Sequence, residues 1–345
     1  MDKRVVFAVA GSGKTSSIIQ QLNLESRCLI VTYTDNNTSH LKKRIIKKFG
    51  LIPKGVKVYS YFTFLYSFCF RPICGYQLKT KGLIFPNSLP KHILQSKKDS
   101  RKHYIDPNLR LYANRLAKLL IEFNVVSDVI KRIEHFFDFV FVDEVQDFAA
   151  NDFNFLCALS ATDVDIQLVG DFFQHTFDTS NDGMIQKNLH KSFEGYCKQF
   201  EKAGYTIDLT SLSHSYRCSP SICSFVTENI GINIESHRKD AVEVCLLEDQ
   251  LEIDKIFLDN SVAKLFFNKS TSYNGNTHNW GSTKGLDHFN DVCVVLNPNT
   301  FRAFKNSQLE SLASTTKNKL YVACTRANRN LYFVNQSSLI KYKID

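Results

Sequence analysis

The stretch Ala8-Val9-Ala10-Gly11-Ser12-Gly13-Lys14-Thr15 decides the fold class of this 345-residue chain. Residues 5–9 form a short, apolar, largely β-branched run, which predicts a buried strand. Residues 16–22, directly after the stretch, have the composition of the first turns of a helix. A strand, a glycine-rich loop ending in Lys-Thr and a helix are the context in which such a loop binds phosphate. The stretch therefore predicts a phosphate-binding loop in an α/β domain.

The residue types in this loop suit a nucleoside triphosphate and Mg²⁺. Gly11 and Gly13 allow backbone N–H groups to turn toward an anion, because no Cβ stands in the way. The N-terminus of the following helix adds partial positive charge. Lys14 can reach the β- and γ-phosphates, and the Thr15 hydroxyl can bind Mg²⁺. The expected nucleotide ligands in the loop are Ala10, Gly11, Ser12, Gly13, Lys14 and Thr15. An accidental Gly/Ser loop is the alternative, and the flanking strand and helix argue against it.

Composition narrows the class of protein. Hydrophobic residues make up 43% and charged residues 22%, which are ordinary values for a globular chain long enough for two domains. No apolar run reaches the length of a membrane span, and residues 1–4 lead straight into the predicted strand, so we expect neither a span nor a targeting segment. Ten cysteines without a CxxC pair favour buried thiols in a reducing, cytoplasmic compartment. The net charge of +9 is compatible with a nucleic-acid partner but does not require one.

Residues 139–147, Phe-Val-Phe-Val-Asp-Glu-Val-Gln-Asp, form a second anchor. A fully apolar run of this kind predicts a strand buried in a parallel sheet, and ligands bind at the carboxyl end of such strands. Two adjacent carboxylates stand at that end. We expect Asp143 to hold Mg²⁺ together with Thr15, and Glu144 to activate the attacking water. The alternative is a strand that merely ends in acidic loop residues.

Two further predicted strands end in polar or aromatic residues. Residues 165–171 end in an aspartate, and Gln174 follows at a position suited to sensing the γ-phosphate. Residues 27–34 carry Tyr33 near their end, where its ring can meet a base. The helix predicted at residues 38–49 carries five lysines and arginines, which form either a solvated face or a face that contacts phosphates.

The order of elements predicts two parallel α/β domains. Strands and helices alternate again in the second half of the chain, which indicates a second parallel sheet. We place the first domain at residues 1–205 and the second at residues 206–345. Residues 72–135 are predicted to be a small, mainly helical insertion in the first domain, with a loop-rich, proline- and lysine-rich first part.

Several spaced motifs together resemble the superfamily 1 helicases of the UvrD/Rep type. The phosphate-binding stretch is similar to their motif I, in which Ala at the first position is usual, and Asp143-Glu144-Val145-Gln146-Asp147 matches their Asp-Glu-x-Gln-Asp form. The other similar stretches, which extend the resemblance over nearly the whole chain, are residues 29–34, 60–63, 169–174, 216–217, 284–287 and 321–327.

The resemblance implies two RecA-like domains with ATP between them and single-stranded nucleic acid across their top. By motif position, Gln174 couples the γ-phosphate to domain closure, Arg217 and Arg326 reach the γ-phosphate, and Tyr216 stacks on adenine. Gly285 and Asp287 belong to a motif assigned to the nucleotide site. The residues assigned to nucleic acid are Thr32, Tyr33, Tyr61, Phe62, Thr63 and Phe177.

We therefore expect an ATP- and Mg²⁺-dependent helicase or translocase on single-stranded or tailed nucleic acid. The preference for DNA and 3′-to-5′ movement follow from the resemblance alone. The alternative is an ATPase switch that is regulated by nucleic acid or by a protein partner and does not unwind processively. A small-molecule kinase is a third reading, against which the motifs at residues 216–217 and 325–326 argue. The compact length and the many Lys, Asn, Ile and Phe residues fit a protein encoded by a virus or a mobile element.

Overall fold

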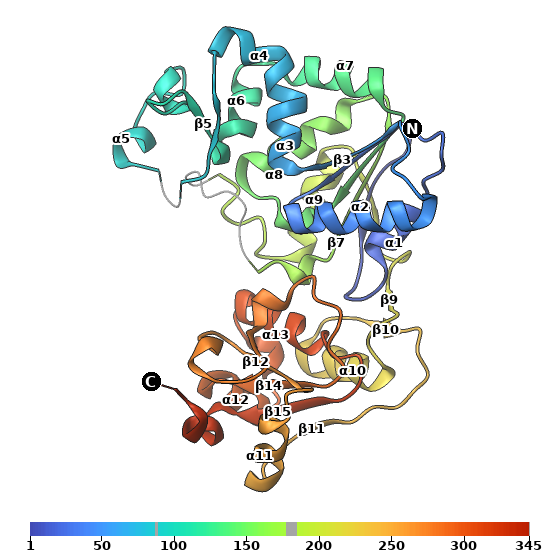
Figure 1. Cartoon of the computed structure of the whole chain (residues 1–345), viewed down its shortest axis with the longest axis vertical. Coiled ribbons are helices and arrows are strands. Elements are labelled where there is room, and N and C mark those ends of the chain that lie inside the picture. The colour runs from blue at the N-terminus through green and yellow to red at the C-terminus, as the bar shows by residue number, and fades with distance from the viewer. Residues whose placement is uncertain (87–88, 177–184, 345) are drawn as a thin grey trace. The chain divides into compact units, whose positions relative to one another are not determined.

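The computed structural model describes residues 1–86, 89–176 and 185–344, which form two compact units (Figure 1). The first unit contains Met1–Val6, Thr15–Gly170 and the described part of residues 177–208. The second unit contains Phe7–Lys14, Asp171–Thr176 and the described residues from Leu209 onward. The phosphate-binding stretch is thus assigned to the second unit up to Lys14 and to the first unit from Thr15.

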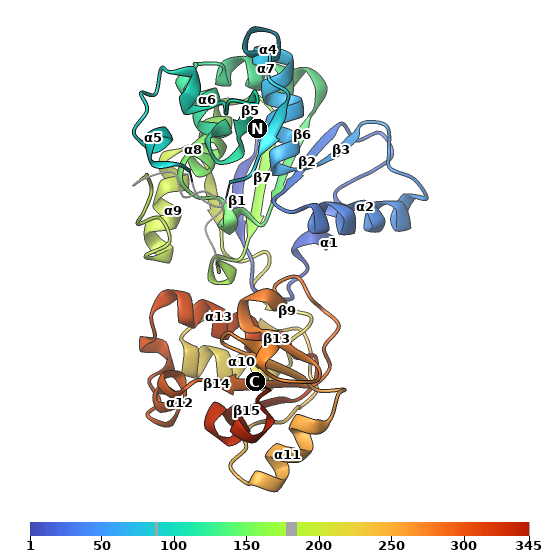
Figure 2. The same ribbon diagram turned by 60° about the vertical axis from the view of Figure 1, so that its left-hand side comes forward.

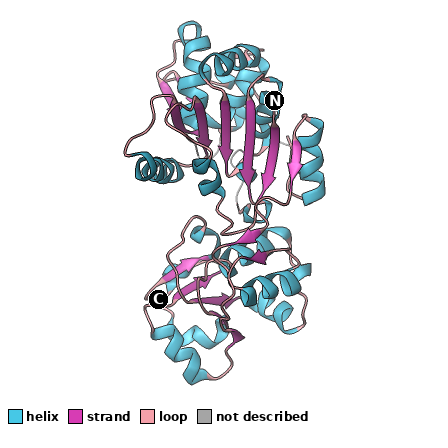
Figure 3. Cartoon of the chain, turned by 90° about the vertical axis from the view of Figure 1, so that its right-hand side faces the viewer, coloured by secondary structure: helices cyan, strands magenta, loops and turns pink. Residues whose placement is uncertain are grey.

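Within the described residues, six strands form the sheet of the first unit, in the order β3-β2-β6-β7-β1-β8 (Figure 3). The strands are β1 (Lys3–Phe7), β2 (Cys28–Thr32), β3 (Val56–Ser60), β6 (Phe139–Asp143), β7 (Asp165–Gly170) and β8 (Thr206–Asp208). The pairs β1–β8, β2–β3, β2–β6 and β6–β7 are parallel. β2 is buried along its whole length, as expected for a central parallel strand. Only β7 separates β1, which precedes the phosphate-binding loop, from the acidic strand β6.

Helices flank this sheet in the first unit. They are α1 (Lys14–Gln20), α2 (Asp35–Phe49), α6 (Leu116–Glu122), α7 (Val126–Phe136), α8 (Ala150–Ala158) and α9 (Phe193–Lys202). α2 begins where the Thr34 hydroxyl accepts a hydrogen bond from the Asn37 N–H, 3.1 Å away, and ends at Gly50 in the left-handed region. This helix packs along β2 and β3 (Figure 2).

The predicted insertion consists of several short elements. It is preceded by α3 (Tyr61–Thr63) and the π-helical segment Phe64–Phe70, and it includes most of α4 (Arg71–Leu78), then β4 (Gly82–Ile84), α5 (Lys91–Leu94) and β5 (Arg110–Tyr112). β4 and β5 pair in parallel to form a separate two-stranded sheet. Leu116, Leu119 and Leu120, which lie on α6, are fully buried.

The second unit has its own parallel sheet, with five described strands in the order β11-β15-β14-β12-β13. They are β11 (Val244–Leu246), β12 (Ala263–Phe266), β13 (Thr277–Asn279), β14 (Val292–Leu296) and β15 (Leu331–Asn335); β9 (His214–Ser215) and β10 (Glu235–Ser236) form a small separate pair. The helices are α10 (Pro220–Phe225), the π-helical segment Val226–Ile230, α11 (Gln250–Leu258), α12 (Pro298–Lys305) and α13 (Ser314–Cys324). The core includes Trp280, fully buried, whose Nε1–H donates to the Leu265 carbonyl at 2.8 Å.

Short 3₁₀ turns complete the two units. They lie at Arg101–His103, Ala113–Arg115, Val145–Asp147, Leu159–Ala161, Phe172–Gln174, Ser270–Ser272, Trp280–Thr283, Leu309–Ser311 and Gln336–Tyr342. Two parallel sheets flanked by helices confirm the predicted α/β, RecA-like fold class. No described helix is both long and apolar enough to cross a membrane. All ten cysteines are free thiols.

Candidate nucleotide site and nucleic-acid groove

The phosphate-binding loop has the backbone that its glycines predict. Gly11 and Gly13 have φ values of +73° and +87°, in the left-handed region that other residues rarely adopt. A Cβ on Gly11 would lie only 2.6 Å from the Arg217 Cβ, so the close approach of these two backbones requires glycine. The Gly11 carbonyl accepts a hydrogen bond from the Tyr216 N–H at 2.9 Å. The Ser12 hydroxyl is buried and has no hydrogen-bond partner among the described residues, which fits a loop shaped to surround an anion.

Within the first unit, the start of α1 meets the end of β6. The Thr15 hydroxyl donates to Asp143 Oδ2 at 3.2 Å. The other carboxylate oxygen of Asp143 accepts a hydrogen bond from the Glu144 N–H at 3.0 Å. A hydroxyl and a carboxylate at this distance are a donor set suited to Mg²⁺, which proteins commonly hold through one or two carboxylates plus substrate phosphates.

Glu144 is held in an unusual backbone conformation. Its φ of +60° and ψ of +43° lie in the left-handed region, where a residue with a side chain is strained by about 1–3 kcal/mol. Its carboxylate accepts a hydrogen bond from the Gln146 amide. Gly170, at the end of β7, makes room for that amide, because a Cβ there would lie 2.3 Å from Gln146 Oε1. The Asp-Glu-x-Gln segment is therefore fixed by both its own residues and its neighbouring strand.

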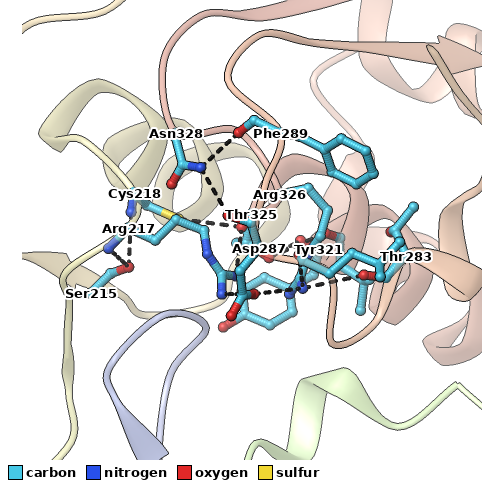
Figure 4. Close-up of polar contacts among 12 residues, drawn as sticks. Ser215, Arg217, Cys218, Thr283, Asp287, Phe289, Tyr321, Thr325, Arg326 and Asn328 are labelled. Carbon is cyan, nitrogen blue, oxygen red and sulfur yellow. Dashed lines mark hydrogen bonds and ion pairs between the residues drawn. The ribbon is translucent and has the colours of Figure 1, made fainter. Parts of the chain in front are cut away.

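Arg217 and Asp287 form the centre of a polar cluster in the second unit (Figure 4). The Arg217 guanidinium pairs with the Asp287 carboxylate and also donates to the Thr325 carbonyl at 3.2 Å. The side chain of Arg217 is 13% exposed and that of Asp287 is 60% exposed. The resemblance assigned Asp287 to the nucleotide; in this structure the carboxylate binds the arginine beside the phosphate loop. Gly285, two residues earlier, has a φ of +81°.

Arg326 occupies a different environment from Arg217. Its side chain is 2% exposed and donates to the carbonyls of Val322, Thr283 and Leu286 at 3.1, 3.3 and 3.0 Å (Figure 4). Its Nη1 lies 3.8 Å from Asp287 Oδ1. Burial, together with the nearby charge of Arg217, lowers the pKa of Arg326 to about 10. In this arrangement Arg326 joins α13 to the loop after Trp280–Thr283, and its hydrogen bonds point into the protein.

Tyr216 presents one face of its ring to solvent. It is 65% exposed, and its other face stacks on His237, with ring centroids 4.1 Å apart and planes 19° apart. His214 continues the column at 4.9 Å from His237 and pairs with the Glu235 carboxylate at 2.7 Å. An exposed aromatic face supported from behind suits a stacked base.

Gln174 lies on the 3₁₀ turn Phe172–Gln174 of the second unit, and it is buried. Asp171 caps this turn, because its carboxylate accepts the Phe173 N–H at 3.1 Å. Phe177, which was assigned to nucleic acid, lies outside the described residues.

A groove of about 470 Å³ lies at the ends of β2 and β3 in the first unit. Its lining combines aromatic rings with small polar groups, namely Tyr33, Thr34, Asp35, Ser60, Phe62, Thr63, Tyr66, Ser67, Leu83 and Phe85. Phe62 contacts Tyr33 edge-on at 5.8 Å and Phe85 at 5.0 Å between ring centroids. The groove therefore gathers three of the residues assigned to nucleic acid, Tyr33, Phe62 and Thr63.

Two other residues assigned to nucleic acid are buried in the first unit. Thr32 is fully buried on β2. Tyr61 is fully buried as well, and its hydroxyl donates to Asp152 Oδ1 at 3.0 Å. Neither Thr32 nor Tyr61 therefore presents a side chain to solvent.

The basic helix α2 has two distinct sets of cations. Arg44 donates to the Ser16 hydroxyl at 2.6 Å, and Lys48 donates to three carbonyls at the end of α1, among them Ile19 at 2.7 Å. Lys42, Lys43 and Lys47 are exposed. The helix thus uses part of its charge to hold α1 and leaves part on the surface.

Several residues of these sites were not predicted from the sequence. Tyr66 and Phe85 line the groove, but Phe85 lies in a proline-rich segment that shows no periodic pattern. His237 supports Tyr216, but residues 218–236, which carry no motif, separate His237 from the Tyr216-Arg217 pair. In this part of the site, only the Tyr216-Arg217 pair could be recognised from the sequence.

Comparison with solved structures finds viral helicases of similar architecture. The PRRSV helicase is 14% identical, with 99% of this chain and 54% of that chain covered and a TM-score of 0.47. Arterivirus nonstructural protein 10, a helicase, is 14% identical in its complex with DNA, with 96% and 60% covered and a TM-score of 0.48. A second structure of arterivirus nonstructural protein 10 is 13% identical, with 97% and 60% covered and a TM-score of 0.49. The present chain spans 54 to 60% of the length of these proteins.

The sequence matches no protein-family model and no curated protein sequence.

Proposed function

We propose that the chain is a nucleic-acid-dependent ATPase of the superfamily 1 helicase kind, which moves along single-stranded nucleic acid. The observation that carries the proposal is the hydrogen bond between Thr15 and Asp143, with Glu144 next in the chain. It joins the end of the phosphate-binding stretch to an acidic strand end, as hydrolysis of a nucleoside triphosphate requires. We take DNA as the preferred strand and 3′-to-5′ as the direction from the sequence resemblance.

The residues of the loop and of β6 have separate roles in the proposed hydrolysis. Lys14 and the loop N–H groups bind the phosphates, and Thr15 and Asp143 hold Mg²⁺. Glu144 orients and deprotonates the attacking water. A bound Mg²⁺ would neutralise part of the phosphate charge.

The two arginines of the cluster around Asp287 are assigned different roles in the second unit. Arg217 lies against Gly11, and its guanidinium is partly exposed, so we assign it to the charge that develops on the γ-phosphate. Arg326 has its donors on protein carbonyls, and we assign it to holding the loop that carries Asp287. Gln174 is assigned to sensing the γ-phosphate from its turn.

The base is proposed to stack on the open face of Tyr216. His237 supports the ring from behind, which keeps it oriented. Stacking is tolerant of base identity because every base has a π-face.

The aromatic groove is proposed to hold unstacked bases of the strand. Base–aromatic stacking contributes about 1–3 kcal/mol per base and needs no sequence readout. The exposed lysines of α2 lie on the helix that starts at the groove residues Thr34 and Asp35, and we assign them to strand phosphates. A motor needs contacts that do not depend on base identity, because it must bind and release each base in turn.

An ATPase switch without processive unwinding is the second candidate function. The observation that favours it is the structure of residues 218–283, which connect Arg217 to Lys284. These residues form α10, α11 and β10 to β13, which belong to the second unit itself. The connection therefore adds no further accessory domain that could assist unwinding.

Displacement of a labelled strand from tailed duplexes tests the proposal. We expect ATP-dependent displacement on a 3′-tailed duplex and none on a 5′-tailed one. Displacement on the 5′-tailed duplex alone would reverse the assigned direction. Strong stimulation of ATP hydrolysis by single strands without displacement on either duplex would support the switch.

A further inference from the structure

Tyr321 lies at a meeting point of three segments that are far apart in the sequence. It sits on α13, and its side chain is fully buried in the core of the second unit. Its hydroxyl accepts a hydrogen bond from the Ala10 N–H at 2.9 Å and donates one to Asp171 Oδ2 at 3.0 Å. All three residues belong to the second unit.

The two contacts use the hydroxyl in both of its capacities. A phenolic O–H has one donor and can accept from an N–H at the same time. Burial, followed by the charge of Asp171, raises the pKa of Tyr321 well above its ordinary value, so the hydroxyl keeps its proton and remains a donor. A hydrogen bond to a carboxylate is about twice as strong as one between neutral groups.

Each partner of the hydroxyl belongs to the proposed nucleotide site. Ala10 directly precedes the glycines of the phosphate-binding loop. Asp171 caps the turn Phe172–Gln174 through the Phe173 N–H, and its carbonyl accepts the Gln174 N–H at 2.9 Å. α13 holds the same segment a second time, since the Asn318 amide donates to the His175 carbonyl at 3.1 Å.

We propose that the Tyr321 hydroxyl is a positioning group of the nucleotide site, which fixes the phosphate-binding loop at Ala10 and the Gln174 turn through Asp171. The inference rests on the proposed function for its effect on catalysis. It assigns no contact between Tyr321 and a substrate.

Tyr321→Phe removes the hydroxyl and keeps the buried ring. We expect kcat for ATP hydrolysis to fall about tenfold or more, because small misplacements of reacting groups have effects of this size. The KM for ATP should change less than threefold, since the hydroxyl touches no substrate group. Tyr205→Phe is the matched control: Tyr205 is also buried, and its hydroxyl donates to the Leu156 carbonyl at 3.0 Å in the first unit. It should leave both constants unchanged.

Amide hydrogen exchange gives a readout that does not depend on activity. In Tyr321→Phe the peptides that cover Ala10 and residues 171–176 should exchange faster than in the wild type, whereas Tyr205→Phe should not alter them. If the wild type hydrolyses no nucleotide but exchange changes as expected, the proposed function fails and the positioning role stands. Unchanged kcat together with unchanged exchange in Tyr321→Phe would overturn the positioning role.

Asp171→Asn tests the same link from the other side. It keeps the size of the side chain and replaces the charged acceptor with a neutral one, so kcat should fall in the same direction with a nearly constant KM. If Tyr321→Phe does not fold, this variant decides: an unchanged kcat in folded Asp171→Asn overturns the proposal.

Discussion

Glu144 has a strained backbone and a carboxylate suited to act as the general base that deprotonates the attacking water. Its left-handed conformation follows directly on β6, and its carboxylate is held by the Gln146 amide. Strain of this kind persists where the surrounding structure fixes it, and here β7 and Gly170 supply that support. The residue scale therefore offers the sharpest test of the proposed hydrolysis.

Glu144→Gln should abolish turnover while ATP still binds. A glutamine keeps the oxygen that accepts from Gln146 but cannot take a proton from water, and general-base catalysis contributes about 10²–10⁴-fold. Steady-state hydrolysis and binding of a fluorescent ATP analogue measure the two effects. Lys14→Ala, by contrast, should lose binding as well as hydrolysis. Hydrolysis at the wild-type rate in Glu144→Gln would show that the assignment of the base is wrong.

Arg217→Ala and Arg326→Ala should separate a catalytic charge from a structural one. Arg217→Ala should lower kcat on the order of 10²-fold and should lower the free energy of unfolding less than Arg326→Ala does, because its ionic partner Asp287 is 60% exposed. Arg326→Ala should lower the free energy of unfolding by about 1–3 kcal/mol, because three hydrogen bonds from its guanidinium to carbonyls inside the protein are lost. Urea unfolding and kinetics on both variants provide the comparison. An unchanged unfolding free energy in Arg326→Ala would return that residue to the γ-phosphate.

At the scale of elements, strand ends decide where the site lies. The carboxyl ends of β6 and β7 bring the acidic pair and Gly170 together, and the end of β2 and the start of α2 form one wall of the groove. The sequence was sufficient to predict these strands, because their apolar runs are long enough to mark buried parallel strands. It was insufficient for Tyr66 and Phe85, since neither a period nor a motif indicates that a residue of the segment Phe64–Phe70 and a residue after β4 line one groove.

Gly170→Ala should destabilise the end of β7. The added Cβ would lie 2.8 Å from Val145 Cγ1 as well as close to the Gln146 amide, and such overpacking costs about 1–3 kcal/mol. Gly75→Ala on α4 is the matched control, because its Cβ would meet nothing closer than 3.4 Å and should stabilise the helix by about 0.5–1 kcal/mol. Urea unfolding of both variants gives the two signs. Equal stability of Gly170→Ala and the wild type would contradict the packing described here.

Phe62→Ala and Phe85→Ala should weaken binding of single-stranded nucleic acid. Loss of one stacking ring costs about 1–3 kcal/mol, or roughly 5- to 150-fold in Kd, and hydrolysis without nucleic acid should stay unchanged. Tyr76→Ala is the control, since Tyr76 is 90% exposed on α4 and does not line the groove. Fluorescence anisotropy with labelled oligonucleotides measures the affinities. Equal losses in all three variants would remove the groove from the proposed interface.

At the scale of the whole molecule, the sequence predicted the fold class and the two parallel sheets, because alternating strands and helices leave few other arrangements. The sequence could not predict contacts between residues that are far apart in the chain. Ala10 and Tyr321 are 311 positions apart, and each lies in a motif whose own chemistry gives no reason to pair them. Arg326 is the converse case: its motif predicted a phosphate contact, whereas the structure shows its donors on three carbonyls.

The central claim is that nucleic acid controls ATP hydrolysis by this chain. The most direct measurement is steady-state ATP hydrolysis by the full chain with and without single-stranded DNA or RNA, with Glu144→Gln as the inactive control. We predict Mg²⁺-dependent hydrolysis that single strands stimulate at least tenfold, with DNA the stronger activator. Hydrolysis that neither DNA nor RNA of any sequence stimulates would contradict the account.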